Sequence, residues 1–256
     1  MAHRDKLCPD RNEGRASDRV CNTETRVVSN PKASLSQSSM LKLQKFRKRY
    51  GSYAALNIGD IEIPSGIFWI QGSNGSGKST FLKALAGVLA FDGDILLDGV
   101  LSIKKQPVRY RSTVNFAEAE PLFPEFLTGT EMVRLFIEAK GGSPDQTDRY
   151  VENIGMAPHI HRSIGSFSSG MVKKLSLILA FIGKPQLILL DEPLITLDAL
   201  SLDVLYSWIQ EANRDHGVSF LLSSHQSLNT DFVKDASEIV VENKTLNLLN
   251  DPLVNK

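Results

Sequence analysis

A glycine- and serine-rich segment with a single lysine carries the first chemical signal of the sequence. Residues 72–80 read GSNGSGKST, follow the apolar run IFWIQ at 67–71, and fit the spacing G-x-x-x-x-G-K-[ST] at Gly72, Gly77, Lys78 and Ser79. Glycines let the backbone N–H groups of such a loop close around an anion, and the N-terminus of a following helix adds partial positive charge. We therefore predict a phosphate-binding loop, with Lys78 on the phosphate oxygens and the Ser79 hydroxyl on Mg²⁺. The alternative is a flexible turn without a ligand.

Two adjacent acids at the end of an apolar run carry the second signal. The segment LILLDEP at 187–193 places Asp191 and Glu192 where a buried strand ends. Neighbouring carboxylates repel each other and favour a site that holds a cation or a reacting water. We predict that Asp191 holds Mg²⁺ through water and that Glu192 orients or deprotonates a water that attacks phosphorus. The alternative is a helix-capping acid beside a solvated neighbour.

The elements that position these residues alternate between strand and helix. Short apolar or β-branched runs predict strands over 41–46, 58–63, 67–71, 95–97, 114–116, 187–190, 219–222 and 239–241. Residues 79–89 are compatible with a helix, and residues 128–180 are mostly helical in pattern. Without an internal repeat, this order predicts an α/β fold with a helical insertion.

Composition limits the classes of protein that fit. Among 256 residues, 29 Lys and Arg balance 29 Asp and Glu. This balance disfavours a protein that coats nucleic acid or an anionic membrane, and we expect no nucleic-acid partner. The longest apolar run, 175–183, is about half of the roughly 20 residues of a membrane span, and the charged N-terminus lacks a secretory signal. We expect a cytoplasmic protein in which Cys8 and Cys21 are incidental reduced thiols.

Four segments in a fixed order resemble the ATP-binding-cassette (ABC) family. They are residues 72–80, FSSGMVKKL at 167–175, LILLDEP at 187–193, and SSH ending at His225. The resemblance covers about residues 40–245 and implies a P-loop NTPase core with a small antiparallel β subdomain and a helical subdomain at about 122–182. It places the ABC ATPase domain at 40–246, followed by a C-terminal tail at 247–256. Residues 1–39 are rich in Arg, Asp, Asn and Ser and have few large apolar side chains, which predicts a disordered tail. A second hypothesis is that Met40 is the natural start and the tail comes from an overlong gene assignment.

The resemblance also implies roles for individual residues. The ATP-binding set comprises Tyr50, Gly72, Ser73, Asn74, Gly75, Ser76, Gly77, Lys78, Ser79 and Thr80. Tyr50 corresponds to the aromatic residue that stacks on adenine, and its alternative is an ordinary aromatic of the first sheet. His225 corresponds to the switch histidine at the γ-phosphate, which makes Glu192, His225 and Lys78 the catalytic set. A lone histidine is otherwise more often a plain core or surface residue.

A signature segment and an aspartate complete the resemblance. FSSGM matches the family signature LSGGQ at Ser168 and Gly170 and departs from it at Ser169 and Met171. In the family, the residues at the positions of Ser168, Ser169 and Gly170 contact ATP held by a second subunit. The alternative is that Ser168 is an ordinary helix cap. Asp198 corresponds to the D-loop aspartate. Met171 resembles the variant of exporter-type cassettes.

Two positions depart from the family pattern near the reacting groups. Glu118 stands where most members have glutamine; a carboxylate still ligates Mg²⁺ but adds negative charge beside the phosphates. Leu194 replaces a small hydroxyl residue, and the sequence offers no physical reason for it. Neither change removes a group that the chemistry requires, so we expect hydrolysis to survive.

The resemblance implies an ATP-hydrolysing transporter subunit. Such a subunit would dimerise head to tail around two MgATP, as a homodimer or heterodimer. The dimer would drive a membrane permease on a separate chain. Binding to the permease would place the subunit on the inner face of the cell membrane. Leu122, Phe123, Pro124 and Phe126 would form the groove for that permease, unless they only pack under the helical subdomain. The rival hypotheses are a soluble ABC ATPase with a non-transport partner and a nucleotide-binding regulator without turnover.

Overall fold

The computed structural model describes residues 39–225 and 236–249. The expected N-terminal tail up to residue 38, with both cysteines, and the last residues 250–256 lie outside this range. The first described strand, β1 (Ser39–Tyr50), already includes Met40, which is buried. The proposals of a disordered tail and of a natural start at Met40 therefore stay predictions.

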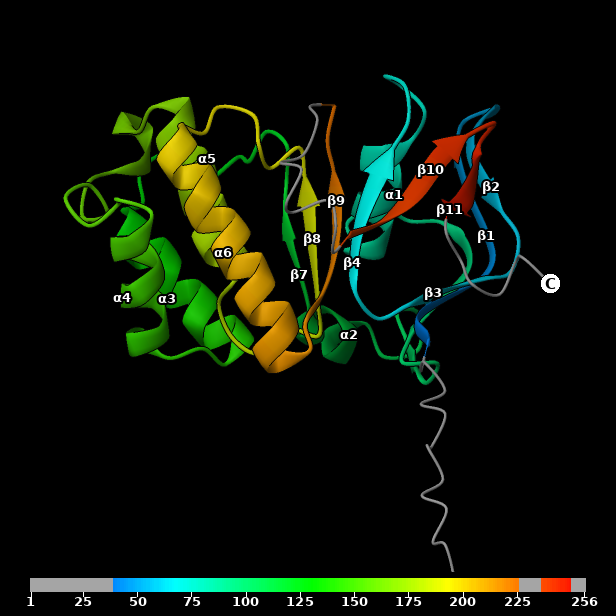
Figure 1. The fold of residues 1–256 in the computed structure, drawn as a ribbon, viewed down its shortest axis with the longest axis horizontal. Helices are drawn as coiled ribbons and strands as arrows, with labels where there is room; N and C mark the ends of the chain where they lie inside the picture. Colours follow the sequence, from blue (N-terminus) through cyan, green and yellow to red (C-terminus); the bar gives the residue numbers. More distant parts are fainter. Residues whose placement is uncertain (1–38, 226–235, 250–256) are drawn as a thin grey trace, which may run out of the picture. The chain divides into compact units, whose positions relative to one another are not determined.

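A mostly parallel sheet forms one half of the described fold (Figure 1). Its order is β11-β10-β4-β9-β8-β7, with β11 antiparallel to β10 and the other neighbours parallel. The strands are β4 (Ile67–Gln71), β7 (Val114–Ala117), β8 (Leu187–Asp191), β9 (Ser219–Ser223), β10 (Ala236–Glu242) and β11 (Thr245–Leu249). Because the chain runs the same way in β4, β7, β8 and β9, their carboxyl ends meet at one edge.

An antiparallel sheet forms the second layer. It contains β1, β2 (Tyr53–Ile58), β3 (Ile61–Pro64), β5 (Asp92–Leu97) and β6 (Leu101–Ser102). The expectation of one strand over 58–63 is wrong, because the chain turns at residues 59–60 and both β2 and β3 pair with β1. The turn is held at Asp60, whose Oδ1 accepts a hydrogen bond from the Lys45 backbone N–H at 2.9 Å.

Helices fill the connections between strands. They are α1 (Lys78–Leu85), α2 (Pro107–Thr113), α3 (Gly129–Lys140), α4 (Pro144–Asn153), α5 (Ser169–Ala180) and α6 (Ala199–His216), with a 3₁₀ turn at Ile164–Ser166. The expected helix over 79–89 is too long, because Gly87 takes a left-handed φ of 73°. No helix within residues 39–225 and 236–249 has the length and apolar character needed to cross a bilayer.

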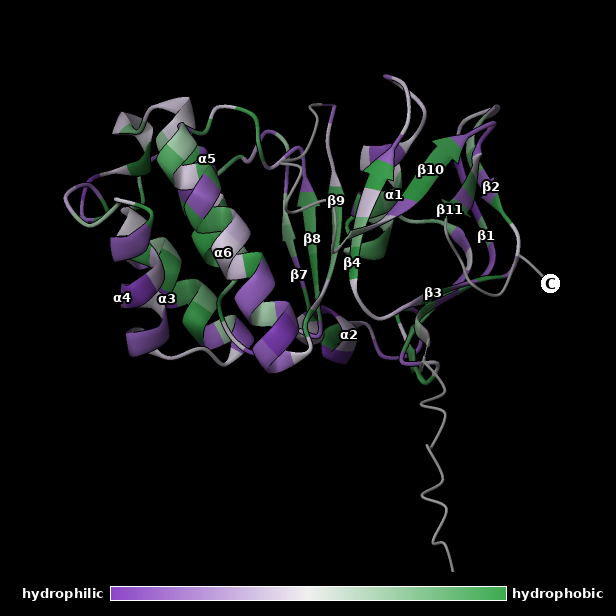
Figure 2. Ribbon diagram, viewed as in Figure 1, coloured by the Kyte–Doolittle hydropathy of each residue, from purple (hydrophilic) through white to green (hydrophobic). Residues whose placement is uncertain are grey.

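The central strands of the parallel sheet are mostly hydrophobic (Figure 2), and their side chains enter a core on each face, as the sequence predicts. Along β8, Leu187 and Leu189 pack with α1 and the antiparallel sheet, whereas Ile188 and Leu190 pack with α5 and α6. This alternation fixes β8 between two cores and leaves only its carboxyl end for chemistry. At the other end of the chain, β11 continues to Leu249, so the tail expected from residue 247 begins later than the sequence indicated.

Candidate nucleotide site

Glycine is required in the loop between β4 and α1 for steric reasons. Gly72 and Gly77 have positive φ values of 152° and 111°. A Cβ atom on Gly72 would lie 2.6 Å from the Val241 carbonyl oxygen, and one on Gly77 would lie 2.8 Å from Leu56 Cδ2. Both distances are shorter than any ordinary contact, so the loop passes too close to the two sheets for a side chain.

The ammonium of Lys78 lies inside this loop. Its Nζ donates to the carbonyl oxygens of Gly72 at 2.8 Å and Ser73 at 3.2 Å. Burial lowers the pKa of Lys78, and the negative charges of Glu192 and Asp191 oppose that effect. The buried Ser76 hydroxyl has no hydrogen-bond partner among the described residues. A cation and an unused hydroxyl in a tight glycine loop are suited to phosphate oxygens.

Three oxygen-bearing side chains meet at the carboxyl ends of β8 and β9. Asp191 Oδ1 accepts hydrogen bonds from the hydroxyls of Ser79, at 3.1 Å, and Ser223, at 2.6 Å. Asp191 is buried, and its Oδ2 has no hydrogen-bond partner in the described part of the chain. A buried carboxylate with a free oxygen beside a hydroxyl is the kind of hard oxygen donor set that Mg²⁺ prefers. The residues therefore fit the predicted metal.

The neighbouring acid, Glu192, is held in an unusual backbone conformation. Its φ is +45°, a value rare for a residue with a side chain, and its N–H donates to Ser223 Oγ at 3.0 Å. The His225 backbone N–H donates to Glu192 Oε2 at 3.2 Å, and His225 Nε2 lies 3.1 Å from Oε1. The structure thus brings Glu192 and His225 together beside Asp191.

Glu118 has a cationic partner in the structure. The residue follows β7, at the same edge of the sheet, but its Oε2 pairs with Nζ of Lys83 in α1 at 3.0 Å. The structure therefore gives this carboxylate a cationic partner, and its role as a magnesium ligand stays a prediction. Leu194, the other departure, is buried in the core with the α5 and α6 side chains, which accounts for an apolar residue there.

The signature segment begins α5. Ser168 is the N-cap, and its hydroxyl accepts a hydrogen bond from the Met171 N–H at 3.3 Å. Ser168 and Ser169 are exposed. A Cβ atom on Gly170 would lie 3.1 Å from the Thr196 carbonyl oxygen, which ties this turn closely to the segment after β8. An exposed helix N-terminus with two exposed serines is compatible with a phosphate from a second subunit.

Asp198 caps the next helix, α6. Its Oδ1 accepts hydrogen bonds from the N–H and the hydroxyl of Ser201, both at 2.9 Å, and its Oδ2 pairs with Lys174 Nζ at 2.9 Å. These contacts hold the pKa of Asp198 well below its usual range, and the contact with Lys174 contributes most. The capping role is therefore structural, and the trans role inferred from the family stays a prediction.

The remaining residues of the predicted ATP-binding set are Tyr50, the tip of the loop and Thr80. Tyr50 ends β1 and is 49% exposed, with Lys48 Nζ 4.7 Å from its ring centroid. Ser73, Asn74 and Gly75 are exposed at the tip of the loop, and Thr80 is half-buried in α1. The exposed Tyr50 ring offers a face for stacking.

Ser223, which was not predicted from the sequence, contacts both acids of the site. Its hydroxyl donates to Asp191 and accepts from the Glu192 N–H. The available signal was the polar pair SS ending the apolar run SFLL, beside the strand that ends in Asp191. That signal becomes meaningful only with the register of β8 and β9, which pairs Asp191 with Ser223.

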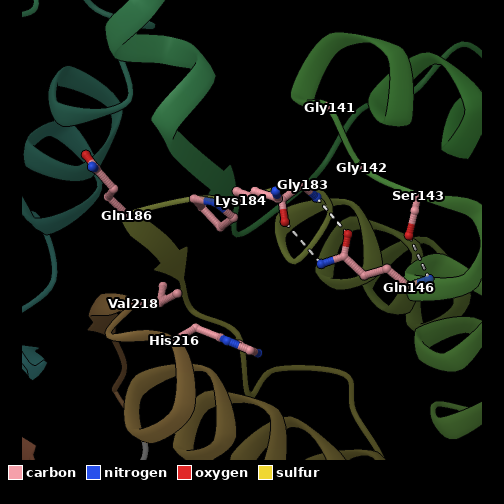
Figure 3. Close-up of a pocket in the computed structure, with 10 residues that line it drawn as sticks. Gly141, Gly142, Ser143, Gln146, Gly183, Lys184, Gln186, His216 and Val218 are labelled. Atoms are coloured by element: carbon pink, nitrogen blue, oxygen red, sulfur yellow. Dashed lines mark hydrogen bonds between the residues drawn. The ribbon is translucent and has the colours of Figure 1, made fainter. Parts of the chain in front are cut away.

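A separate hollow lies away from these residues (Figure 3). It has a volume of about 700 Å³ and is lined mainly by the turns before α4 and β8 and the end of α6, including Ser143, Gln146, Lys184 and His216. Gln186 and Val218, which also line it, immediately precede β8 and β9. The hollow is therefore at the amino edge of the sheet, opposite the phosphate loop, and is not the nucleotide site.

Comparison with known families agrees with the geometry of the carboxyl edge. The family model described as "ABC transporter" matches residues 60–195. The chain belongs to the ABC transporter family. Within that family it is an ATP-binding subunit, an ABC transporter ATPase.

Its relatives include cassettes of transporters with different cargo. It is 28% identical to the lantibiotic transport ATP-binding protein SrtF of Streptococcus pyogenes, over 81% of this chain and 89% of that protein. It is 32% identical to the aliphatic sulfonates import ATP-binding protein SsuB of Pectobacterium atrosepticum, over 75% of this chain and 70% of that one. The bacitracin transport ATP-binding protein BcrA of Enterococcus faecalis is 26% identical, over 82% and 69%.

Solved structures share the fold. An ATP-binding subunit of an ABC transporter superposes with a TM-score of 0.73 at 24% identity, covering 83% of this chain and 91% of that one. A dimeric ATP-binding cassette in a post-hydrolysis state, bound to ADP and Pi, superposes with a TM-score of 0.66 at 19% identity, over 83% and 100%. The expected fold class, an α/β ABC ATPase with an antiparallel β subdomain, is confirmed.

Proposed function

We propose that this chain hydrolyses MgATP as one half of a cassette dimer and thereby drives a membrane permease carried by a separate chain. One observation carries the proposal: Lys78, Asp191, Glu192 and His225 converge at the carboxyl edge of β4, β8 and β9. The open edge of a parallel sheet is where nucleotides bind in such folds.

The site residues divide the work of phosphoryl transfer. The main-chain amides of residues 72–80 and the Lys78 ammonium bind the phosphates, and Thr80 contacts the α-phosphate. Ser79 and Asp191 hold Mg²⁺, which neutralises charge on the phosphate oxygens when bound. Glu192 takes the proton of the attacking water, and His225 holds the γ-phosphate and orients Glu192. Tyr50 stacks on the adenine.

The signature segment supports a dimer. Ser168, Ser169 and Gly170 lie exposed or half-buried at the N-terminus of α5, where amide N–H groups lack partners within the helix. In a head-to-tail pair this surface would face the γ-phosphate bound by the other subunit, and Asp198 would lie at the same contact. The dimer is formed either by two copies of this chain or by this chain and another cassette.

The permease is proposed to dock beside the segment after β7. Leu122 is 94% exposed and Phe126 is 81% exposed. Leu122 also lines a cavity of about 150 Å³, together with Phe116, Phe123 and Phe136. Exposed apolar side chains around a small pocket are typical of a surface that contacts another protein. Docking there would hold the subunit on the inner, cytoplasmic face of the membrane.

ATP hydrolysis measured with and without membranes that contain the co-purifying permease tests this function. We expect the membranes to stimulate ATP hydrolysis by the wild type. A Leu122→Ser, Phe126→Ser double variant should keep the basal activity and lose this stimulation. Stimulation by a soluble partner alone would favour the non-transport ATPase. Tight ATP binding with no turnover under either condition would favour the regulator.

A further inference from the structure

Lys173, a lysine of α5, is almost completely buried. Its relative exposure is 2%, and it lies among the largest fully buried side chains of the described residues. Burial of an ammonium is unfavourable unless each of its three N–H donors finds an acceptor. Here the acceptors are three main-chain carbonyl oxygens: Glu118 at 2.9 Å, Ala119 at 3.1 Å and Asp191 at 3.1 Å. The side chain thus joins α5 to the ends of β7 and β8.

The third of these contacts reaches the peptide that carries Glu192. The Asp191 carbonyl and the Glu192 N–H belong to one rigid, planar peptide unit. Lys173 donates to the carbonyl oxygen, and Ser223 Oγ accepts from the N–H at 3.0 Å. This peptide is therefore anchored on both sides, by α5 and by β9.

Anchoring on both sides explains how Glu192 keeps its conformation. The residue has a φ of +45°, which a side chain disfavours and which persists only where the surroundings impose it. The orientation of the 191–192 peptide plane sets the direction in which the Glu192 carboxylate leaves the backbone. An error of about 1 Å in the position of a reacting group is enough to cost about 100-fold in rate.

From these contacts we infer that Lys173 is a positioning residue for hydrolysis: it holds the Asp191–Glu192 peptide so that Glu192 addresses the attacking water. The inference rests on the proposed role of Glu192 as the base. The described hydrogen bonds of Lys173 reach Glu118, Ala119 and Asp191 and not the glycine loop or Lys78. Loss of Lys173 therefore acts on turnover and not on ATP affinity.

Lys140 offers a matched control. Its Nζ also donates to main-chain carbonyls, those of Arg111 and Val114, and burial lowers the pKa of both lysines to about 8. Lys140 lies at the end of α3 and has no contact with the site residues among the described hydrogen bonds. A general cost of losing a buried ammonium would affect both positions, whereas a positioning role affects only Lys173.

The experiment compares kcat, KM and the ATP dissociation constant of the full chain for wild type, Lys173→Met, Lys173→Gln, Lys140→Met and Glu192→Gln. We expect Lys173→Met to lower kcat roughly tenfold or more while KM and the dissociation constant stay within about twofold. Lys173→Gln keeps part of the hydrogen bonding and should fall between wild type and Lys173→Met. Lys140→Met should keep kcat within about twofold.

A wild-type kcat in folded Lys173→Met, or a rise in KM at unchanged kcat, would overturn the inference. If Lys173→Met does not fold, Lys173→Gln decides by the same criteria: reduced kcat at unchanged affinity supports the inference, and wild-type kcat overturns it. Glu192→Gln distinguishes failure of the proposed base from failure of the positioning role of Lys173. Should it remain fully active, the proposed base is wrong; should it be inactive beside an active Lys173→Met, only the positioning role is wrong.

Discussion

Glu192 and His225 contact each other twice at the edge of the parallel sheet. The backbone N–H of His225 donates to one carboxylate oxygen at 3.2 Å, and Nε2 of its ring lies 3.1 Å from the other. Both residues follow strands, β8 and β9, that are neighbours in the sheet. The pair therefore combines a proton acceptor with a group that fixes its direction, as a general base requires.

Glu192→Gln should separate binding from turnover. The amide keeps the shape of the side chain but cannot accept a proton from water. We therefore expect kcat to fall by about 10²–10⁴-fold while ATP affinity is retained. Steady-state hydrolysis and equilibrium ATP binding measure the two quantities. ATP should also accumulate a dimer of this variant in size-exclusion chromatography. Glu152→Gln, an exposed change on α4, serves as the control, and an active Glu192→Gln would refute the base.

Glu118→Gln tests whether the Glu118 carboxylate pairs with Lys83 or binds Mg²⁺ in the active protein. If the carboxylate remains with Lys83, its removal leaves the Mg²⁺ concentration for half-maximal activity within about twofold. The free energy of unfolding then falls by at most about 1 kcal/mol, because the pair is half-exposed and screened by solvent. A magnesium titration of ATP hydrolysis gives the first quantity and denaturant unfolding the second. A clear rise in the magnesium requirement would instead make Glu118 a metal ligand.

Asp198 should contribute to stability in a pH-dependent way. Its pKa in the folded chain is lowered, chiefly by Lys174 and then by the Ser201 N–H and hydroxyl. The charged form is thus favoured by folding, so the contribution is complete above the unfolded-state pKa of about 4 and is lost as the pH falls through the folded-state pKa.

Asp198→Asn should therefore lower the free energy of unfolding at pH 7 by about 0.5–1 kcal/mol, since asparagine keeps the cap but not the ion pair. The difference from wild type should shrink below about pH 4. Denaturant unfolding at pH 7 and pH 3 measures it. Asp203→Asn, an exposed change on the same helix, should have little effect at either pH, and an equal loss from both variants would contradict the assignment.

Local sequence was sufficient to predict the parts of the site that lie on short continuous segments. The loop at 72–80 and the acids at 191–192 are each encoded within nine residues, and an apolar run marks the strand before each. That these two segments lie at the same edge is shown by the structure, in which β4, β9 and β8 are parallel neighbours. The α/β class and the helical character of 128–180 needed no more than periodicity.

Contacts between distant segments could not be predicted in this way. Ser223 reaches Asp191 because the two residues pair in the β8–β9 register. Lys83 in α1 pairs with Glu118, 35 residues away in sequence. The turn between β2 and β3 depends on Asp60 meeting the backbone of β1, 15 residues away in sequence. Each of these depends on the tertiary arrangement, on which a local pattern carries no information.

The central claim is that the glycine loop and Lys78 bind the triphosphate of ATP. Lys78 is buried with its ammonium inside the loop, where a charged hydrogen bond to phosphate is worth about 1.5–3 kcal/mol. Removing it should therefore weaken ATP binding by about 10–100-fold. Lys83→Ala, a change of a surface-paired lysine on the same helix, provides the control.

The most direct measurement is an isothermal titration of the purified chain with ATP and Mg²⁺, for wild type, Lys78→Ala and Lys83→Ala. We expect saturable binding by wild type, an affinity reduced by about one to two orders of magnitude in Lys78→Ala, and near wild-type affinity in Lys83→Ala. Equal affinity in all three proteins, or no binding by wild type at millimolar ATP, would contradict the account.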